Sequence, residues 1–243
     1  MKLVWLTALG VGGATVLGSL IGFVFRRISH RFSDLVLSFA AGVMLAAAVL
    51  GLIVPSVEYG GKGGLVITVA GIFTGALCLN LIDRLVGVEL EKHHGNANLN
   101  KVLLFVTAIA IHNLPEGIAA GVSFGTDNVA DALLIAGGIA LQNVPEGMVI
   151  IGPMLAAGIT PGRTFLCALA TGLIEVAGTL LGYFAVTVAT AILPFALAFA
   201  GGTMLYVISD EMIPETHHDG AGGVTYALLA GFCVMLVSDV LLG

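Results

Sequence analysis

The chain has 243 residues, of which 58% are hydrophobic and 10% are charged, and its net charge is −6 at pH 7. A soluble domain carries about 25% charged residues, so this composition excludes an ordinary soluble globular domain and predicts an all-α integral membrane protein. The 3 cysteines lie in apolar stretches without a Cys-x-x-Cys pair, which argues against a zinc finger and against a fold built on disulfides.

Eight stretches are long and apolar enough to cross a bilayer, which takes about 20 helical residues. In chain order, we expect spans at 3–25, 34–57, 64–84, 101–124, 129–157, 162–190, 194–212 and 222–242. These spans leave no room for a soluble domain, so we expect residues 1–243 to form a single transmembrane domain. The longest expected loop is 85–100, which contains the sequence EKHHGN.

The distribution of basic residues predicts the orientation, because Lys and Arg favour the cytoplasmic loops of membrane proteins. The loops after odd-numbered spans hold Arg26, Arg27, Arg31, Arg84, Lys92, Lys101 and Arg163, whereas the other side holds Lys2 and Lys62. We therefore expect a multi-pass protein of the cell (inner) membrane, with both termini outside and loop 85–100 in the cytoplasm. The first span is too long for a cleaved signal peptide, so we expect it to be retained.

Three spans recur later in the chain, in the same order and at the same distance. This distance, which takes residue 39 to residue 199, is called the repeat offset. FAAGVML at 39–45 matches FAGGTML at 199–205, GSLIGF at 18–23 matches GTLLGY at 178–183, and Ala-Gly at 70–71 matches Ala-Gly at 230–231. The first and sixth spans are an odd number of crossings apart, so the two triplets cross the membrane in opposite senses. The sequence thus predicts an inverted 3+2+3 repeat, an arrangement that many secondary transporters use, with spans 4 and 5 between the triplets.

The two central spans carry nearly identical motifs, HNLPEG at 112–117 and QNVPEG at 142–147. On a helix, His112 and Glu116 share a face at i, i+4, and Asn113 joins them at i, i+3. Gln142, Asn143 and Glu146 repeat this geometry on the next span. Each motif also contains a proline, Pro115 or Pro145, which removes one helical hydrogen bond and predicts a broken helix that lines a cavity.

The motif glutamates and Glu175 lie near the middle of their spans, where an ionised group costs at least about 2.5–3.5 kcal/mol. No Lys or Arg lies at that depth in any predicted span. Carboxylates without basic partners need a cation, and three of them are balanced best by one or two divalent ions. An imidazole with carboxylate and amide oxygens suits Zn²⁺, Fe²⁺ or Mn²⁺.

The paired motifs, the eight spans and the histidine-bearing loop after span 3 resemble the ZIP (Zrt/Irt-like) family of divalent metal transporters, over essentially the whole chain. The resemblance is closest to the bacterial GufA-like branch, in which Gln opens the second motif. It implies zinc uptake into the cytoplasm by an elevator-like, alternating-access carrier, in which spans 1, 4, 5 and 6 move against spans 2, 3, 7 and 8. Cadmium, iron and manganese are further expected cargoes.

The resemblance also assigns residues. It implies that the transported metal is held by His112, Glu116, Gln142 and Glu146, together with Met44. Asn113, Asn143 and Glu175 would join the two glutamates at an adjacent second site. Some relatives with two metals have Asp where this chain has Asn143, so one or two ions are expected. The stretch ISDEMIPETHH at 208–218 resembles the end of the family's span 7, where Asp210 and Glu211 would bind metal in transit.

The resemblance implies no enzyme activity and no cofactor. The expected partners are divalent metal ions and the lipid bilayer, with a homodimer left open and with neither nucleic acid nor nucleotide. Several alternatives remain at this point: proline kinks with a purely structural role, Glu175 as a protonated helix-packing residue, and Met44 as ordinary packing. For the whole protein, the alternatives are a divalent cation channel and an intramembrane metalloenzyme.

Overall fold

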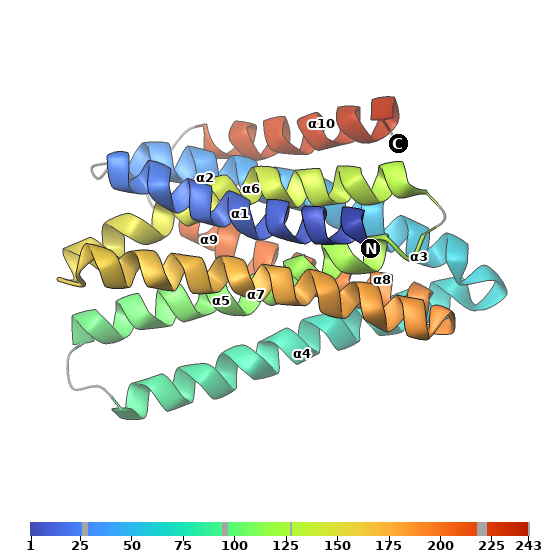
Figure 1. Ribbon diagram of the computed structural model, residues 1–243, viewed down its shortest axis with the longest axis horizontal. Helices are drawn as coiled ribbons and strands as arrows, with labels where there is room; N and C mark the ends of the chain where they lie inside the picture. Colours follow the sequence, from blue (N-terminus) through green and yellow to red (C-terminus); the bar gives the residue numbers. More distant parts are fainter. Residues whose placement is uncertain (26–28, 94–96, 127, 218–222, 243) are drawn as a thin grey trace.

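In the computed structural model, every regular element in the described part of the chain is a helix (Figure 1). The structure describes residues 1–25, 29–93, 97–126, 128–217 and 223–242. The long helices are α1 (Lys2–Val24), α2 (His30–Ala46), α4 (Gly64–His93), α5 (Ala97–Ser123), α6 (Val129–Ala156), α7 (Pro161–Val188), α8 (Leu193–Val207) and α10 (Val224–Leu242). The short elements are α3 (Val54–Tyr59), α9 (Ile213–Thr216), the 3₁₀ turns η2 (Gly61–Gly63) and η3 (Thr190–Ile192), and the π-helical segments η1 (Ala47–Ile53) and η4 (Ile208–Met212).

Several helix ends follow from local sequence signals. Helix α6 starts after Asn128, whose side-chain oxygen accepts a hydrogen bond from the backbone N–H of Ala130 at 2.9 Å. It ends just before Gly158, whose φ of +81° suits glycine, and α7 then opens with Pro161 at its first position. Such capping residues satisfy or replace the backbone groups that a helix leaves free at its ends.

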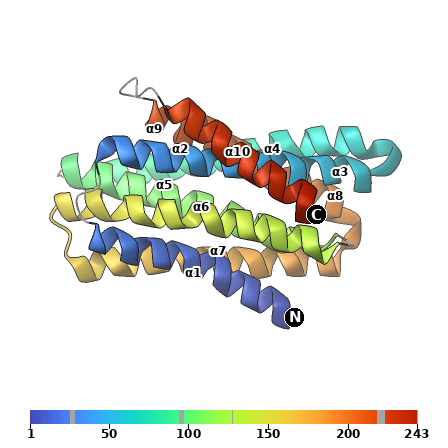
Figure 2. The same cartoon turned by 90° about the horizontal axis from the view of Figure 1, so that it is seen from above.

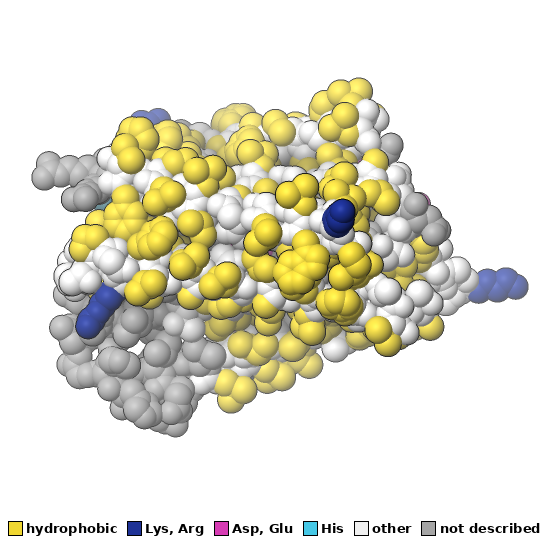
Figure 3. All heavy atoms as spheres, in the orientation of Figure 1, with side chains coloured by type: hydrophobic (Ala, Val, Ile, Leu, Met, Phe, Trp, Pro, Cys, Tyr) yellow, Lys and Arg dark blue, Asp and Glu magenta, His cyan; other side chains and the backbone are white. Residues whose placement is uncertain are grey.

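The helices have the length and surface of membrane spans. By length and composition, seven stretches of the described residues could cross a membrane: Lys2–Val24, His30–Tyr59, Gly61–Leu85, Val129–Ala156, Pro161–Val188, Thr190–Thr216 and Val224–Leu242. Helix α5 covers the remaining predicted span and is 27 residues long. Large apolar side chains such as Phe73 and Leu181 are exposed, and hydrophobic side chains dominate the face in Figure 3. The prediction of an all-α, multi-pass membrane protein is confirmed.

The long helices pack in two groups. Helix α1 packs most extensively on α6 and α7, and α5 packs on α7, whereas α4 packs on α8 and α10 packs on α2. Helices α4 and α10 lie at opposite edges of the bundle (Figure 1). The groups meet where α2 contacts α6 and α5 contacts α8, over a core that includes Met44, Ile139 and Met204. Both chain termini lie at one end of the bundle, opposite the ends where α4 finishes and α5 begins (Figures 1 and 2).

The predicted loop at 85–100 is largely helical, so that prediction was wrong. Helix α4 continues to His93 and α5 begins at Ala97, and residues 94–96 lie outside the described part. The segment from 85 to 93 includes Leu90, Glu91 and Lys92, which are good helix formers but too polar as a group to extend an apolar span. The predicted span therefore ends where the apolar composition ends, whereas the helix continues to His93.

The predicted breaks at Pro115 and Pro145 are also absent, because α5 and α6 run through both prolines without interruption. A helix in a bundle can lose one hydrogen bond at proline and still continue where its neighbours support it. The irregular backbone lies elsewhere, in the π-helical segments η1 and η4. These two segments are themselves related by the repeat offset, since position 48 corresponds to 208 and position 52 to 212.

Further contacts follow the same offset. A Cβ built on Gly12 would collide with the carbonyl oxygen of Gly172, and a Cβ on Gly172 would lie 2.5 Å from that of Gly12. The two glycines are therefore mutual neighbours on α1 and α7. Gly18 and Gly178 likewise face the backbone carbonyls of Val144 on α6 and Leu114 on α5. These matched contacts agree with an inverted repeat, which itself remains a prediction.

Candidate metal site

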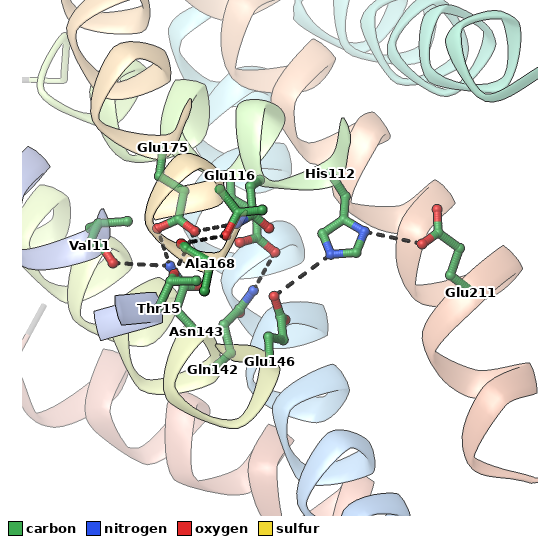
Figure 4. A network of polar contacts seen from close by, with 12 residues as sticks. Val11, Thr15, His112, Glu116, Gln142, Asn143, Glu146, Ala168, Glu175 and Glu211 are labelled. Carbon is green, nitrogen blue, oxygen red and sulfur yellow. Dashed lines mark hydrogen bonds and ion pairs between the residues drawn. The ribbon is translucent and has the colours of Figure 1, made fainter. Parts of the chain in front are cut away.

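The two sequence motifs meet in the interior of the bundle, where α5 and α6 lie against each other (Figure 4). Helix α5 contributes His112, Asn113 and Glu116, and α6 contributes Gln142, Asn143 and Glu146. All six are at most 5% exposed. Because both helices are continuous through the motifs, the i, i+3 and i, i+4 spacing puts each set on one helix face, as the sequence predicted.

One end of the cluster is built around Glu175 of α7. One carboxylate oxygen, Oε1, accepts hydrogen bonds from Thr15 Oγ1 at 2.6 Å and from Asn113 Nδ2 at 2.5 Å. The other, Oε2, accepts one from Asn143 Nδ2 at 2.6 Å. The Asn143 amide also donates to the carbonyl oxygen of Val11 at 3.3 Å. Helices α1, α5, α6 and α7 therefore converge on a single carboxylate (Figure 4).

The middle of the cluster joins the two motifs directly. The Gln142 amide on α6 donates to Glu116 Oε1 on α5 at 2.7 Å. Both residues are almost fully buried, at 1% and 0% exposed. This hydrogen bond links the two helices directly, but a neutral amide brings no positive charge to the buried carboxyl group.

The other end of the cluster is built around His112. Its Nδ1 lies 3.1 Å from Glu211 Oε2, and its Nε2 lies 3.8 Å from Glu146 Oε2. The first distance is that of a hydrogen bond, whereas the second is a looser electrostatic contact. The imidazole thus lies between a carboxylate of α6 and one of η4 (Figure 4).

Five buried oxygen atoms of the cluster have no hydrogen-bond partner. They are Asn113 Oδ1, Glu116 Oε2, Gln142 Oε1, Asn143 Oδ1 and Glu146 Oε1. The described residues also provide no Lys or Arg partner for these carboxylates. A buried polar atom without a partner costs about 1–3 kcal/mol, so this many in one place is unfavourable unless a cation binds there.

In the structure as it stands, no three His, Cys, Asp or Glu side chains of the described residues surround one point as metal ligands. In the structure, Glu116 Oε1 accepts a hydrogen bond from the Gln142 amide, and Glu146 Oε2 faces His112. A cation entering the cluster would therefore use the free oxygens first, or displace these two contacts. The donor set of imidazole, carboxylate and amide oxygens suits a borderline divalent ion.

Two residues that the sequence assigned to the metal path have different surroundings. Glu211 is in contact with His112, so it belongs to the same cluster. Asp210 is exposed, and it accepts a hydrogen bond at 3.2 Å from the Tyr206 hydroxyl, which in turn accepts one from Asn80. The structure therefore brings Glu211 into the site and leaves Asp210 on the adjacent surface. The π-helical turn η4 carries both, and such turns are frequent at functional sites.

Met44 of α2 is completely buried in the apolar core, as is Met204 of α8. The role of Met44 as a ligand stays a prediction.

Three groups of the candidate site were not predicted from the sequence. Thr15 and the Val11 carbonyl both come from α1, which carries no charged residue near the site. Asp83 of α4 interacts electrostatically with Glu211, His112 and Asp210. A signal for Thr15 was present, because it stands one repeat offset before Glu175 in the sequence.

Known proteins resemble this chain along most of its length. The family model described as the ZIP zinc transporter matches residues 90–239. The zinc transporter GufA of Myxococcus xanthus is 38% identical over 243 residues, which cover 96% of this chain and 96% of that protein. The zinc transporter ZIPB of Bordetella bronchiseptica is 39% identical over 247 residues (95% and 78%), and the zinc transporter ZupT of Chlorobaculum parvum is 36% identical over 253 residues (93% and 92%). On this similarity, the chain belongs to the ZIP zinc transporter family.

Proposed function

We propose that this protein carries zinc across the membrane into the cytoplasm, and that the zinc binds in the cluster between α5 and α6. The observation that carries the proposal is the set of five buried, unpartnered oxygen atoms contributed by the two motifs. A purely structural cluster would gain nothing from leaving these oxygens unpaired, whereas a site that binds and releases cargo needs them. The relatives above, each named as a zinc transporter, supply the identity of the metal.

The proposed ligands are those that the sequence suggested. His112, Glu116, Gln142 and Glu146 hold the transported ion, with Met44 approaching from α2. Asn113, Asn143 and Glu175 form an adjacent second position that shares the two glutamates, so the site holds one or two ions. Nitrogen and sulfur ligands together with carboxylates favour zinc and cadmium, and the oxygen-rich remainder extends the proposal to iron and manganese.

The proposed mechanism is alternating access. One unit would comprise α1, α5, α6 and α7, and the other α2, α4, α8 and α10. The packing supports this division, because the most extensive contacts of α1, α4, α5 and α10 fall within these units. The inverted repeat belongs to the same proposal, since two related triplets can exchange their environments and so form two access states. Glu211 and Met44 lie on the second unit, so the metal's surroundings change when the units move.

The proposed orientation follows from the basic residues, with both termini outside and residues 85–100 on the cytoplasmic side. Arg26 and Arg27, and the side chains of Lys92 and Lys101, lie outside the described residues. The bundle is consistent with this orientation, because the termini share one end and α4 meets α5 at the other (Figure 1). We further propose that the protein is a carrier and not an enzyme, that it uses no cofactor or nucleotide, and that it works in the bilayer as a monomer or a homodimer.

The deciding experiment is metal uptake by proteoliposomes that contain the purified protein. Zn²⁺ uptake should saturate, and Cd²⁺, Fe²⁺ and Mn²⁺ should compete with it while Mg²⁺ should not. Empty liposomes provide the control for leakage. Uptake that does not saturate and is accompanied by single-channel currents in planar bilayers would indicate a cation channel instead. Absence of any Zn²⁺ uptake by folded protein would contradict the proposal.

A further inference from the structure

Glu175 is held by neutral hydrogen-bond donors from three different helices. Thr15 of α1, Asn113 of α5 and Asn143 of α6 all donate to its carboxylate, at 2.5–2.6 Å. All four side chains are 0% exposed. The carboxylate is therefore well satisfied by protein groups in the absence of any cation, unlike Glu116 and Glu146, which each keep an unpartnered oxygen.

This arrangement fixes the direction of both asparagine side chains. An ionised carboxylate can only accept hydrogen bonds, and the nitrogen end of each carboxamide faces Glu175 in the structure. The oxygen ends, Asn113 Oδ1 and Asn143 Oδ1, consequently point away from Glu175, and both are buried without a partner. They belong to the same set of free oxygens as those of Glu116, Gln142 and Glu146.

Thr15 and Glu175 are equivalent positions that touch each other. They are separated by the repeat offset, and they are hydrogen-bonded across the α1–α7 contact. One turn away, Gly12 and Gly172 have the same separation and meet through their backbones. The asparagines that flank the pair occupy matching positions in HNLPEG and QNVPEG. Exchanging the two side chains would place the carboxylate on α1 and the hydroxyl on α7, beside the same two asparagines.

We propose that Thr15 and Glu175 form an interchangeable positioning pair: one supplies a carboxylate, the other a hydroxyl that anchors it, and together they turn the oxygens of Asn113 and Asn143 toward the metal. Thr15 acts through Glu175 and does not touch the ion, whereas Glu175 keeps its proposed place at the second metal position. The inference rests on the proposed function, because it assumes that a metal binds at the free oxygens.

The first test is equilibrium binding of Cd²⁺ to the detergent-solubilised protein. Thr15→Val keeps the shape of the side chain but removes the donor, and a hydrogen bond to a charged group is worth about a tenfold change in an equilibrium constant. We expect Cd²⁺ to bind about tenfold more weakly to Thr15→Val. Thr15→Ser, which restores the hydroxyl, should bind within about twofold of the wild type. Equal affinities for Thr15→Val and wild type would overturn the positioning role.

The second test exchanges the pair. Glu175→Thr alone should weaken Cd²⁺ binding by more than about tenfold, because both asparagines lose the acceptor that orients them and the proposed second position loses a carboxylate. The double variant Thr15→Glu/Glu175→Thr should recover most of that loss. Recovery would show that the carboxylate can be supplied from either α1 or α7. If the double variant is monodisperse and binds no better than Glu175→Thr, the pair is not interchangeable; if it does not fold, the Thr15→Val and Thr15→Ser results decide the positioning role.

The outcomes distinguish a failure of the proposed function from a failure of the positioning pair alone. If the folded wild-type protein binds no Cd²⁺ or Zn²⁺, the proposed function fails, and the inference fails with it. If the wild type binds and only the Thr15 and exchange variants behave differently from expectation, the transporter proposal stands and the positioning pair alone is refuted.

Discussion

Two sides of the molecule have the same backbone contacts but different side chains. On one side, α5 packs on α7, with Gly178 against the Leu114 carbonyl; on the other, α6 packs on α1, with Gly18 against the Val144 carbonyl. Such close approach of helices needs glycine, since a Cβ at either position would clash with the carbonyl it faces. The scaffold that positions the two motifs is thus present twice.

The chemistry is present mainly on one side. The α5 side has His112 and Glu175, where the α6 side has Gln142 and Thr15. Similarly, Glu211 of η4 contacts His112. The residue one repeat offset before Glu211 is Gly51, which has no charge and packs on Ile135. The comparison indicates that both halves supply the close helix packing and one motif glutamate each, while the histidine and the two further glutamates of the candidate site come from one half only.

The largest expected effect comes from the one charged pair that both sides share. Glu116→Ala and Glu146→Ala should each reduce Zn²⁺ uptake by more than about a hundredfold, since even groups that only support a ligand are worth about 10–100-fold. Each glutamate is proposed to bridge two metal positions. Uptake by proteoliposomes at equal protein content is the measurement, with Glu58→Ala as the control because Glu58 is exposed on α3. Near-normal uptake by either site variant would remove that residue from the site.

The duplicated scaffold can be broken at its glycines. Gly18→Ala and Gly178→Ala should each lower the free energy of unfolding by about 1–3 kcal/mol, because each new methyl group meets a backbone carbonyl on the neighbouring helix. Thermal unfolding in detergent provides the measurement.

Gly10→Ala on α1 is the matched control for these variants, since a Cβ there meets nothing within 4 Å. It should be neutral or stabilising, because alanine is the better helix former. A large effect at only one of Gly18 and Gly178 would show that the two sides are not mechanically equivalent.

Metal selectivity should distinguish residues at equivalent positions. Met44→Ala and His112→Ala remove the two proposed soft ligands, so binding of Zn²⁺ and Cd²⁺ should weaken about tenfold more than binding of Mn²⁺. Met204→Ala is the control for Met44, since Met204 is equally buried and stands one repeat offset later in the sequence. Competition between metals for the purified protein gives the ratios. A uniform loss for all metals would mean that Met44 packs and His112 gates, and that neither is a ligand.

The smallest expected effect is on pH dependence. Metal ligands must lose their protons to bind, so apparent Zn²⁺ affinity should fall several-fold as pH drops from about 7.5 to about 5.5. His112→Gln makes the α5 motif resemble the α6 motif and removes the imidazole. Its affinity should vary less over the same range, measured by equilibrium binding in detergent. If the wild type shows no change with pH, the imidazole and carboxylates are not the binding groups.

The fold class and the spacing within each motif could be predicted from the sequence, because both depend on local properties. Apolar length determines the spans, and the i, i+4 relation between His112 and Glu116 holds on any continuous helix. The same reasoning failed from 85 to 93 and at Pro115 and Pro145. Hydropathy does not detect a polar helical extension, and proline rules for isolated helices do not include support from neighbours.

Contacts between distant helices could not be predicted in this way. Apolar helices can rotate and pair in many ways at similar free energy, so nothing in α1 alone indicates that Thr15 faces Glu175. Likewise, the pairing of His112 with Glu211 depends on the π-helical turn η4, which has no reliable sequence signal. The repeat offset was the one long-range clue, and it indicated the Thr15 position without indicating the contact.

The hydrogen bond between Thr15 and Glu175 has a consequence for how the protein is made. It joins α1 to a helix that the ribosome produces much later, after four other long helices of the described chain. Until α7 enters the bilayer, Asn113 and Asn143 have no carboxylate to bind, and α1 has only part of its packing surface covered. Contacts of such long sequence separation form late and slowly, so α1 must stay within reach of the later helices during synthesis. A chain that stops before α7 would leave the donors of Thr15, Asn113 and Asn143 without their acceptor in the membrane. Insertion of α7 is therefore the step that completes this part of the assembly.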